Sequence, residues 1–158
     1  KDWQNWDAIF TQNGTLFLVE AKAHVSELSS GKEEHGNSSK KLILDYFKTQ
    51  LPDLPVCEVW LQEYYQLANR LATAALLNKH GIKTKVLYIY FVNGYRKRVL
   101  EKKGRAEILF ETVNLNASEE EFRTAIEKEM LTLGITHEDV SDLLAPPVFV
   151  NAEPVAYK

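Results

Sequence analysis

The sequence predicts an α/β or α+β domain in which one mixed β-sheet is flanked by helices. Short apolar segments typical of strands alternate along the chain with segments of helical periodicity, and this mixed order favours a single sheet covered by helices. The length of 158 residues is that of one domain. Apolar residues make up 45% and charged residues 26%, which is ordinary for a globular protein and excludes a disordered or collagen-like chain.

The first expected element is a β-hairpin with strands over residues 6–10 and 16–23. An Asn-Gly dipeptide at 13–14 lies between them, and this pair favours a type I′ turn because both central residues of that turn need positive φ. A two-residue loop at this position pairs residues whose numbers add up to 27. Asp7 is therefore expected to lie opposite Glu20.

The middle of the chain predicts one exposed loop and two helices. Residues 29–40 are polar and rich in Gly and Ser, which indicates a loop, and a short helix over 42–49 is expected to end before Pro52. Residues 58–80 form the clearest helix, since apolar residues recur every three or four positions and Gly81 suits a C-terminal cap. The apolar stripe consists of Leu61, Tyr64, Leu67, Ala68, Leu71, Ala74 and Ala75.

The remainder predicts three strands and a second long helix. This helix is expected to begin at Ser118, because Glu121 three residues later completes a capping-box pattern, and to end at Gly134. The other expected elements are strands over 84–92 and 107–113, a short helical turn from residue 136 and an edge strand at 148–150.

Neither a membrane span nor a disulfide is expected. No window approaches the ~20 apolar residues that a spanning helix needs, so no membrane partner is predicted. Cys57 is the single cysteine, which excludes an intrachain disulfide. A reducing, cytoplasmic location is the simplest interpretation.

The formal net charge of −3 is unevenly distributed. Residues 79–105 carry nine basic and one acidic side chain, whereas residues 106–158 carry three basic and eleven acidic ones. The densest basic stretch is a candidate nucleic-acid-binding surface that contacts phosphates, and a solvated loop is the alternative. Its members are Arg96, Lys97, Arg98, Lys102, Lys103 and Arg105.

The expected pairing of Asp7 with Glu20 places two like charges side by side among apolar residues, which is destabilising unless a shared proton or a bound cation offsets the repulsion. Two carboxylates on paired strands suit an oxygen-preferring ion such as Mg²⁺. Lys22 lies two residues after Glu20, on the same face of the strand, where its ammonium could stabilise an anion at phosphorus. The alternative is a salt-bridged strand end.

These residues resemble the signature of the PD-(D/E)XK nuclease superfamily, which has the restriction-endonuclease-like fold: an Asp on one strand and a Glu-x-Lys on the next. Asp7 and Glu20-Ala21-Lys22 match it. The resemblance implies that Asp7, Glu20 and the Ala21 carbonyl bind a divalent metal and that Lys22 positions or activates the attacking water. Some members place a Gln from the following helix near the metal, so Gln66 is a further candidate catalytic residue. A solvated helix face is the alternative for Gln66.

The match covers about residues 3–92 and departs from the family pattern in two places. The family often has Pro where Trp6 stands. Its core also begins with a helix and a strand before the Asp, and only six residues precede Asp7. Residues 1–158 are therefore interpreted as one nuclease-like domain, with the N-terminal elements of that core expected outside this sequence.

The predicted function is that of an endonuclease-like hydrolase that uses Mg²⁺ or Mn²⁺ to cut phosphodiester bonds of nucleic acid, with DNA as the expected substrate. Two alternatives remain open. One is a non-catalytic nucleic-acid-binding module of the same fold, and the other is a protein-interaction domain that uses the acidic C-terminal region. A homodimer is also compatible with the sequence.

Overall fold

A computed structural model describes residues 5–29, 37–100, 109–114 and 117–152, with backbone only for 37–39, 95–100 and 109–114. The elements are β1 (Ala8–Gln12), β2 (Thr15–Lys22), the 3₁₀ helix η1 (Val25–Glu27), α1 (Asn37–Gln50), α2 (Glu58–Gln62), α3 (Tyr65–Lys79), β3 (Thr84–Val92), β4 (Tyr95–Leu100), β5 (Leu109–Asn114), α4 (Glu119–Leu133) and β6 (Val148–Asn151). Among these described residues, no helix is long and apolar enough to cross a membrane.

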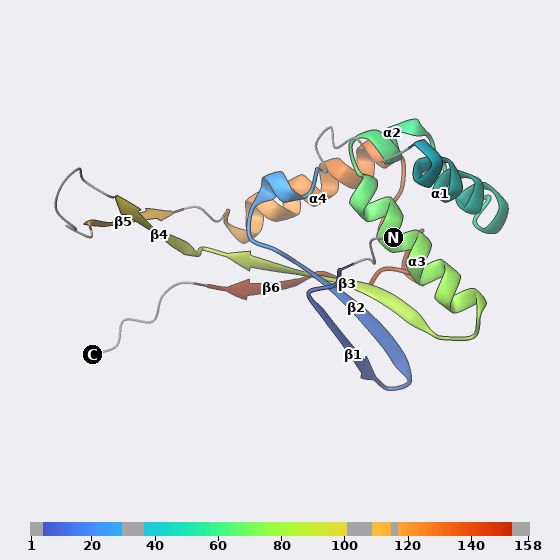
Figure 1. The fold of residues 1–158 in the computed structure, drawn as a ribbon, viewed down its shortest axis with the longest axis horizontal. Coiled ribbons are helices and arrows are strands. Elements are labelled where there is room, and N and C mark those ends of the chain that lie inside the picture. Colours follow the sequence, from blue (N-terminus) through green and yellow to red (C-terminus); the bar gives the residue numbers. More distant parts are fainter. Residues whose placement is uncertain (1–4, 30–36, 101–108, 115–116, 153–158) are drawn as a thin grey trace.

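The main sheet is mixed, with the strand order β1-β2-β3-β6. β1 runs antiparallel to β2, whereas β2 and β6 both run parallel to the central strand β3. β4 and β5 form a separate antiparallel pair that projects away from this sheet (Figure 1). The predicted α/β class with a mixed sheet and flanking helices is confirmed.

The β1–β2 hairpin has the predicted turn and the predicted register. Asn13 and Gly14 have φ values of 49° and 73°, as a type I′ turn requires. The pairs run from Gln12↔Thr15 to Ala8↔Val19, so the paired numbers add up to 27 throughout.

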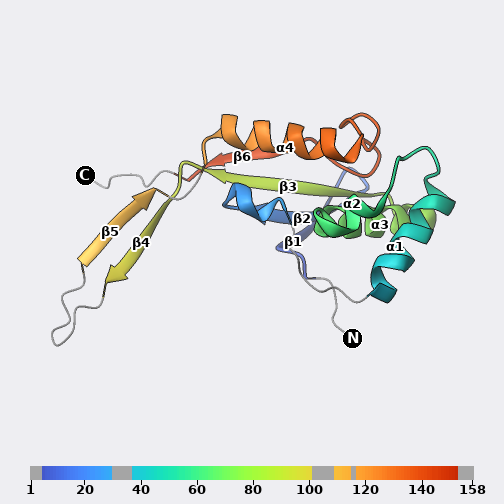
Figure 2. The same ribbon diagram turned by 90° about the horizontal axis from the view of Figure 1, so that it is seen from above.

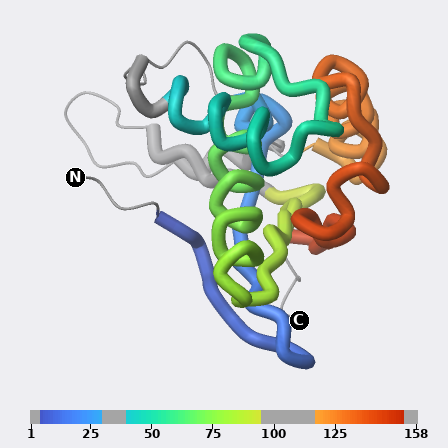
Figure 3. Tube along the Cα trace, turned by 90° about the vertical axis from the view of Figure 1, so that its right-hand side faces the viewer, coloured from blue at the N-terminus to red at the C-terminus, as the bar shows by residue number. Residues whose placement is uncertain are grey.

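Helices α3 and α4 pack on the same face of the sheet. Glu20 and Lys22 of β2 lie beside Tyr88 and Tyr90 of β3 in the parallel register. Side chains of α3 bond to this pair on β2, and the ring of Phe122 from α4 lies 5.0 Å from that of Tyr90. Figure 2 shows α4 beside β6, and Figure 3 shows α3 alongside the hairpin. Both helices therefore cover the face that carries Glu20 and Lys22.

The opposite face of the sheet carries exposed apolar side chains. By the strand register, Phe10 on β1, Phe91 on β3, and Val148 and Val150 on β6 share this face. All four are between 37% and 42% exposed. The sheet is therefore buried mainly on the side of α3 and α4. Glu20 and Lys22 lie on that buried side.

The prediction of one continuous helix over residues 58–80 is wrong. The chain breaks at Glu63 and Tyr64 into α2 and α3. The break lets α2 direct Trp60 towards α4, where its indole Nε1 donates a hydrogen bond to the Leu133 carbonyl at 3.1 Å. Because Trp60 is fully buried there while α3 packs its own stripe on the sheet, tertiary packing overrides the continuous helical pattern.

The first helix is also longer than predicted. α1 begins at Asn37 and not at residue 42, so the last four residues of the expected 29–40 loop are helical. α4 begins and ends as predicted, with a complete capping box between Ser118 and Glu121 and with Gly134 at φ 70° as its C-cap. The strand predicted over 84–92 is confirmed, and the other predicted strands are displaced by one or two residues at their ends, whereas β4 lies where no strand was predicted.

Candidate active site

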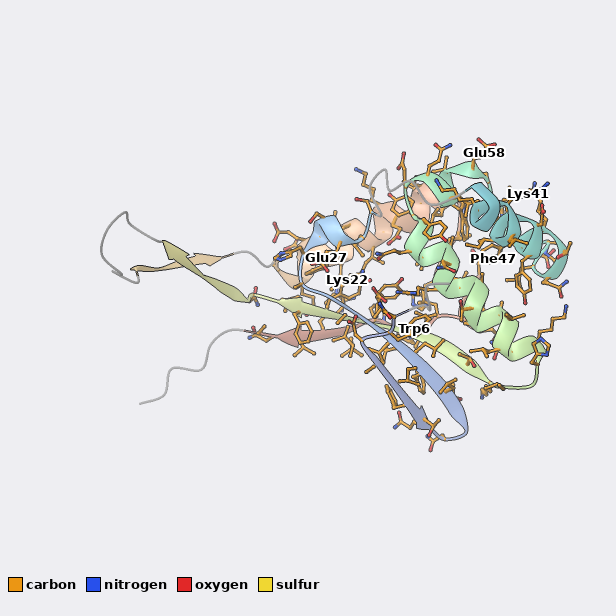
Figure 4. The ribbon with its side chains drawn as sticks, in the orientation of Figure 1. Trp6, Lys22, Glu27, Lys41, Phe47 and Glu58 are labelled. Carbon is orange, nitrogen blue, oxygen red and sulfur yellow. The ribbon has the colours of Figure 1, made fainter. Side chains whose placement is uncertain are left out.

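The candidate site lies at the C-terminal end of β2, beneath α3. Figure 4 labels Lys22 and Trp6 where the strand passes the helices. Glu20 and Lys22 are 7% and 6% exposed, and both side chains lie on the face covered by α3 and α4. The alternation of side chains along β2 explains this placement, since residues two apart share a face.

The Lys22 ammonium is held by two oxygen acceptors. Nζ donates to Glu20 Oε1 at 2.9 Å and to Gln66 Oε1 at 2.8 Å. Gln66 comes from the first turn of α3, so this contact joins residues 44 positions apart. The structure therefore brings together three of the predicted catalytic residues, and it places Gln66 on the site and not on a solvated face.

Arg70 is a fourth member of the cluster that the sequence analysis did not assign to it. Its Nε and Nη2 lie 3.1 and 3.0 Å from Glu20 Oε2, and Nη2 also donates to the Asn5 carbonyl at 2.9 Å. The guanidinium lies over the ring of Trp6, 4.3 Å from its centroid. Gln66 and Arg70 are four residues apart on α3, and this spacing places them on one face of the helix.

Asp7 does not form the regular pair with Glu20 that was predicted. The ladder ends at Ala8↔Val19, and the Asp7 backbone N–H donates to the Val19 carbonyl at 3.1 Å. Its Oδ2 instead accepts a hydrogen bond of 2.7 Å from the Ala21 backbone N–H. The chain bends at Asp7 and its exposed side chain supplies the acceptor, so the carboxylate lies beside the peptide that follows Glu20.

The repulsion between the two carboxylates is offset in this structure by neighbouring donors. Lys22 and Arg70 neutralise Glu20, and a backbone N–H partners Asp7. The salt-bridged strand end considered from the sequence is observed in part, because Lys22 pairs with Glu20 while Asp7 accepts from the Ala21 N–H. Glu20 binds two cations, one on each oxygen.

The donor chemistry of this place fits a hard divalent ion. Asp7 and Glu20 provide carboxylates, and the Ala21 carbonyl points to the same side of β2 as the Ala21 N–H that meets Asp7, because both groups of one strand residue face the same neighbour. Within the described ranges, no group of three or more His, Cys, Asp or Glu side chains is placed to hold an ion. An ion here would therefore depend on these few oxygens and on water, as Mg²⁺ commonly does.

Helix α4 places a buried acid over the face of the sheet that carries Glu20 and Lys22. Glu129 of α4 is 5% exposed, and burial raises its pKa to about 8, while the positive charge of Lys22 acts in the opposite direction. Burial also raises the pKa of Tyr88 and of Tyr90, with the charge of Glu129 adding to both shifts. Glu129 and His137 line a cavity of about 20 Å³, the size of one water molecule.

A signal for Glu129 was present in the sequence. It follows Phe122 by seven positions and falls among Ile126, Met130 and Leu133 in the apolar stripe of α4, where a charged residue is unusual. Its nearness to Lys22 arises from the packing of α4 on the sheet, which the stripe alone does not reveal.

The basic stretch lies away from this cluster along the chain. Arg96, Lys97 and Arg98 belong to β4, which pairs with β5 beyond the end of β3. Only their backbone is described, and Lys102, Lys103 and Arg105 lie outside the described residues. Their predicted contacts with phosphate stay a prediction.

Comparisons of the chain with models of protein families, with curated proteins and with solved structures found no match. The function is therefore inferred from the geometry around Glu20 and Lys22 and from the signature formed by Asp7 and Glu20-Ala21-Lys22.

Proposed function

We propose that this chain is a metal-dependent nuclease domain that hydrolyses phosphodiester bonds of nucleic acid, with DNA as the expected substrate. One observation carries the proposal: a nearly buried lysine is held between Glu20 and Gln66, next to the peptide that binds Asp7. The resemblance of Asp7 and Glu20-Ala21-Lys22 to the PD-(D/E)XK signature supports the same function.

In this proposal Asp7, Glu20 and the Ala21 carbonyl hold Mg²⁺ or Mn²⁺. Such an ion, when bound, would supply Lewis acidity and would lower the pKa of a bound water. Lys22 would donate hydrogen bonds from its ammonium that position the attacking oxygen or stabilise the anion that forms at phosphorus. Gln66 Oε1 accepts a hydrogen bond from Lys22 Nζ and so fixes the direction of the ammonium.

A purely structural role explains this cluster less well. Removing charged groups from water carries a large free-energy cost, and buried ion pairs often stabilise a fold no more than apolar residues of the same size. Here two cations and a carboxylate are nearly buried together, with side chains of Lys22, Arg70 and Glu20 between 7% and 11% exposed. Burial of such an ion-pair cluster is therefore weak evidence for a purely stabilising role.

Metal binding distinguishes the proposed nuclease from the two alternatives, which are a non-catalytic nucleic-acid-binding module and a protein-interaction domain. We expect Mg²⁺ or Mn²⁺ to raise the melting temperature of the wild-type protein and Asp7→Ala to abolish this increase. Asp53→Ala, which removes an exposed carboxylate from a loop, is the matched control and should retain the increase. An equal increase in Asp7→Ala, or none in the wild type, would contradict the proposed metal site.

A further inference from the structure

We propose that Arg70 is a charge-exchange residue: it holds Glu20 while no metal ion is bound, and it moves to a phosphate of the nucleic acid when an ion binds Glu20. This inference rests on the proposed nuclease function. It adds a phosphate-binding role for a residue outside the Asp7, Glu20 and Lys22 signature. It also predicts that Arg70 and the metal compete for one carboxylate.

The competition follows from the occupancy of Glu20. Oε1 accepts a hydrogen bond from Lys22, and Oε2 accepts one from Arg70 Nε and lies 3.0 Å from Nη2 of the same guanidinium. A divalent ion at this carboxylate would face two positive charges within a few ångströms, in a nearly buried environment where charge repulsion is strong. An ion that binds through Oε2 would replace the ion pair with Arg70, while Lys22 could keep both of its acceptors, Glu20 Oε1 and Gln66 Oε1.

The released guanidinium would stay at the site. Two further contacts of Arg70 are with the Asn5 carbonyl and the ring of Trp6, both in the segment that leads directly into Asp7. These two contacts do not involve Glu20, so they can persist when the carboxylate turns to an ion. A guanidinium suits phosphate because its planar fork gives two parallel hydrogen bonds to phosphate oxygens.

The chain contains a matched control for this residue. Arg123 of α4 donates to Glu119 at 2.6 Å and lies over the ring of Phe149, 4.4 Å from its centroid. Like Arg70, it therefore pairs with a carboxylate and stacks on an aromatic ring. Its acidic partner is half exposed and belongs to the first turn of α4, away from the proposed metal donors.

The first experiment measures the affinity for Mg²⁺ alone by titration calorimetry. We expect Arg70→Gln to bind Mg²⁺ about tenfold more tightly than the wild type, the factor that loss of one competing charge-assisted hydrogen bond predicts. Arg123→Gln should bind like the wild type. Equal affinity in Arg70→Gln and the wild type would overturn the competition.

The second experiment observes the guanidinium directly in the wild-type protein, so it does not depend on a variant that folds. The Nε–H resonance of Arg70 is followed by NMR during the Mg²⁺ titration. We expect it to shift as Glu20 is released, while the Arg123 resonance stays in place. An Arg70 resonance that does not move at saturating Mg²⁺ would refute the exchange.

The third experiment tests the phosphate role with a short DNA oligonucleotide in Ca²⁺, which prefers the same oxygen ligands. Arg70→Gln should bind the oligonucleotide about tenfold more weakly in Ca²⁺, although it binds the ion more tightly, and Arg70→Lys should recover part of the loss. Unchanged DNA affinity in Arg70→Gln would remove the phosphate role.

Failure of this inference is distinguishable from failure of the proposed function. If neither the wild type nor Arg70→Gln binds Mg²⁺, the metal-dependent nuclease is wrong and the exchange falls with it. If Asp7→Ala loses Mg²⁺ binding while Arg70→Gln matches the wild type, the nuclease stands and Arg70 has only a structural role.

Discussion

Replacing the buried Glu129 by glutamine should change how the stability of the protein depends on pH. Burial raises the pKa of Glu129 to about 8 from an ordinary value of 4.5. The folded protein therefore keeps a proton that the unfolded chain has lost between these two pH values. Its contribution to stability is complete below pH 4.5 and is lost as the pH rises through about 8.

The shift predicts a large effect. At about 1.4 kcal/mol per pKa unit, the rise from 4.5 to about 8 corresponds to roughly 5 kcal/mol across this window. That is a substantial part of the ~5–15 kcal/mol by which a domain is stable. Glutamine has a similar shape and does not ionise, so Glu129→Gln should remove this dependence.

The assay is urea unfolding of the wild type and Glu129→Gln, followed by circular dichroism at pH values from 5 to 8. We expect similar stability near pH 5 and a progressively more stable variant as the pH rises, by about 1.4 kcal/mol per unit. Glu127→Gln removes an exposed carboxylate from the same helix and should give a much smaller slope. A constant difference between wild type and Glu129→Gln across this range would refute the reasoning.

Three further predictions concern the site, the basic stretch and the helix cap. Lys22→Ala should abolish Mg²⁺-dependent cleavage of DNA while the fold is retained. The control Lys85→Ala, on the opposite face of the sheet, should leave cleavage intact. Full activity of a folded Lys22→Ala protein would exclude a catalytic role for Lys22. Replacing Arg96, Lys97 and Arg98 together by alanine should weaken DNA binding for every sequence and reduce the slope of log affinity against log salt by about 2–3. Fluorescence anisotropy measures this slope, and an unchanged slope would indicate that these side chains are solvated and do not contact phosphate. Ser118→Ala should lower the unfolding free energy by about 1 kcal/mol, because it removes the side-chain acceptor of the Glu121 N–H, and chemical denaturation measures this loss.

Local sequence signals predicted the parts of the fold that local chemistry determines. The Asn-Gly dipeptide at 13–14 set the turn, and the turn set the register of the hairpin. Ser118 and Gly134 set the ends of α4. In each case a few neighbouring residues decide the backbone conformation, so the sequence alone was sufficient.

Tertiary contacts decided what the sequence did not reveal. The bend at Asp7 replaces a ladder pair by a bond from the Ala21 N–H to a side chain, which alternation along a strand does not predict. Arg70 was visible on the polar face of its helix beside Gln66, but its bond to Glu20 depends on where α3 lies over β2. The break before Tyr64 likewise depends on Trp60 reaching another helix.

The bond from Trp60 to the Leu133 carbonyl has a consequence for the order of folding. It joins residues 73 positions apart, and the rings of Trp60 and Phe47 pack against each other at 5.8 Å. Contacts between such distant residues form late, because the intervening chain must first be ordered. During synthesis, a chain that ends before α4 has no partner for the Trp60 indole and leaves part of its apolar surface uncovered. Trp60 fluorescence should therefore report the docking of α4 on the rest of the domain during refolding.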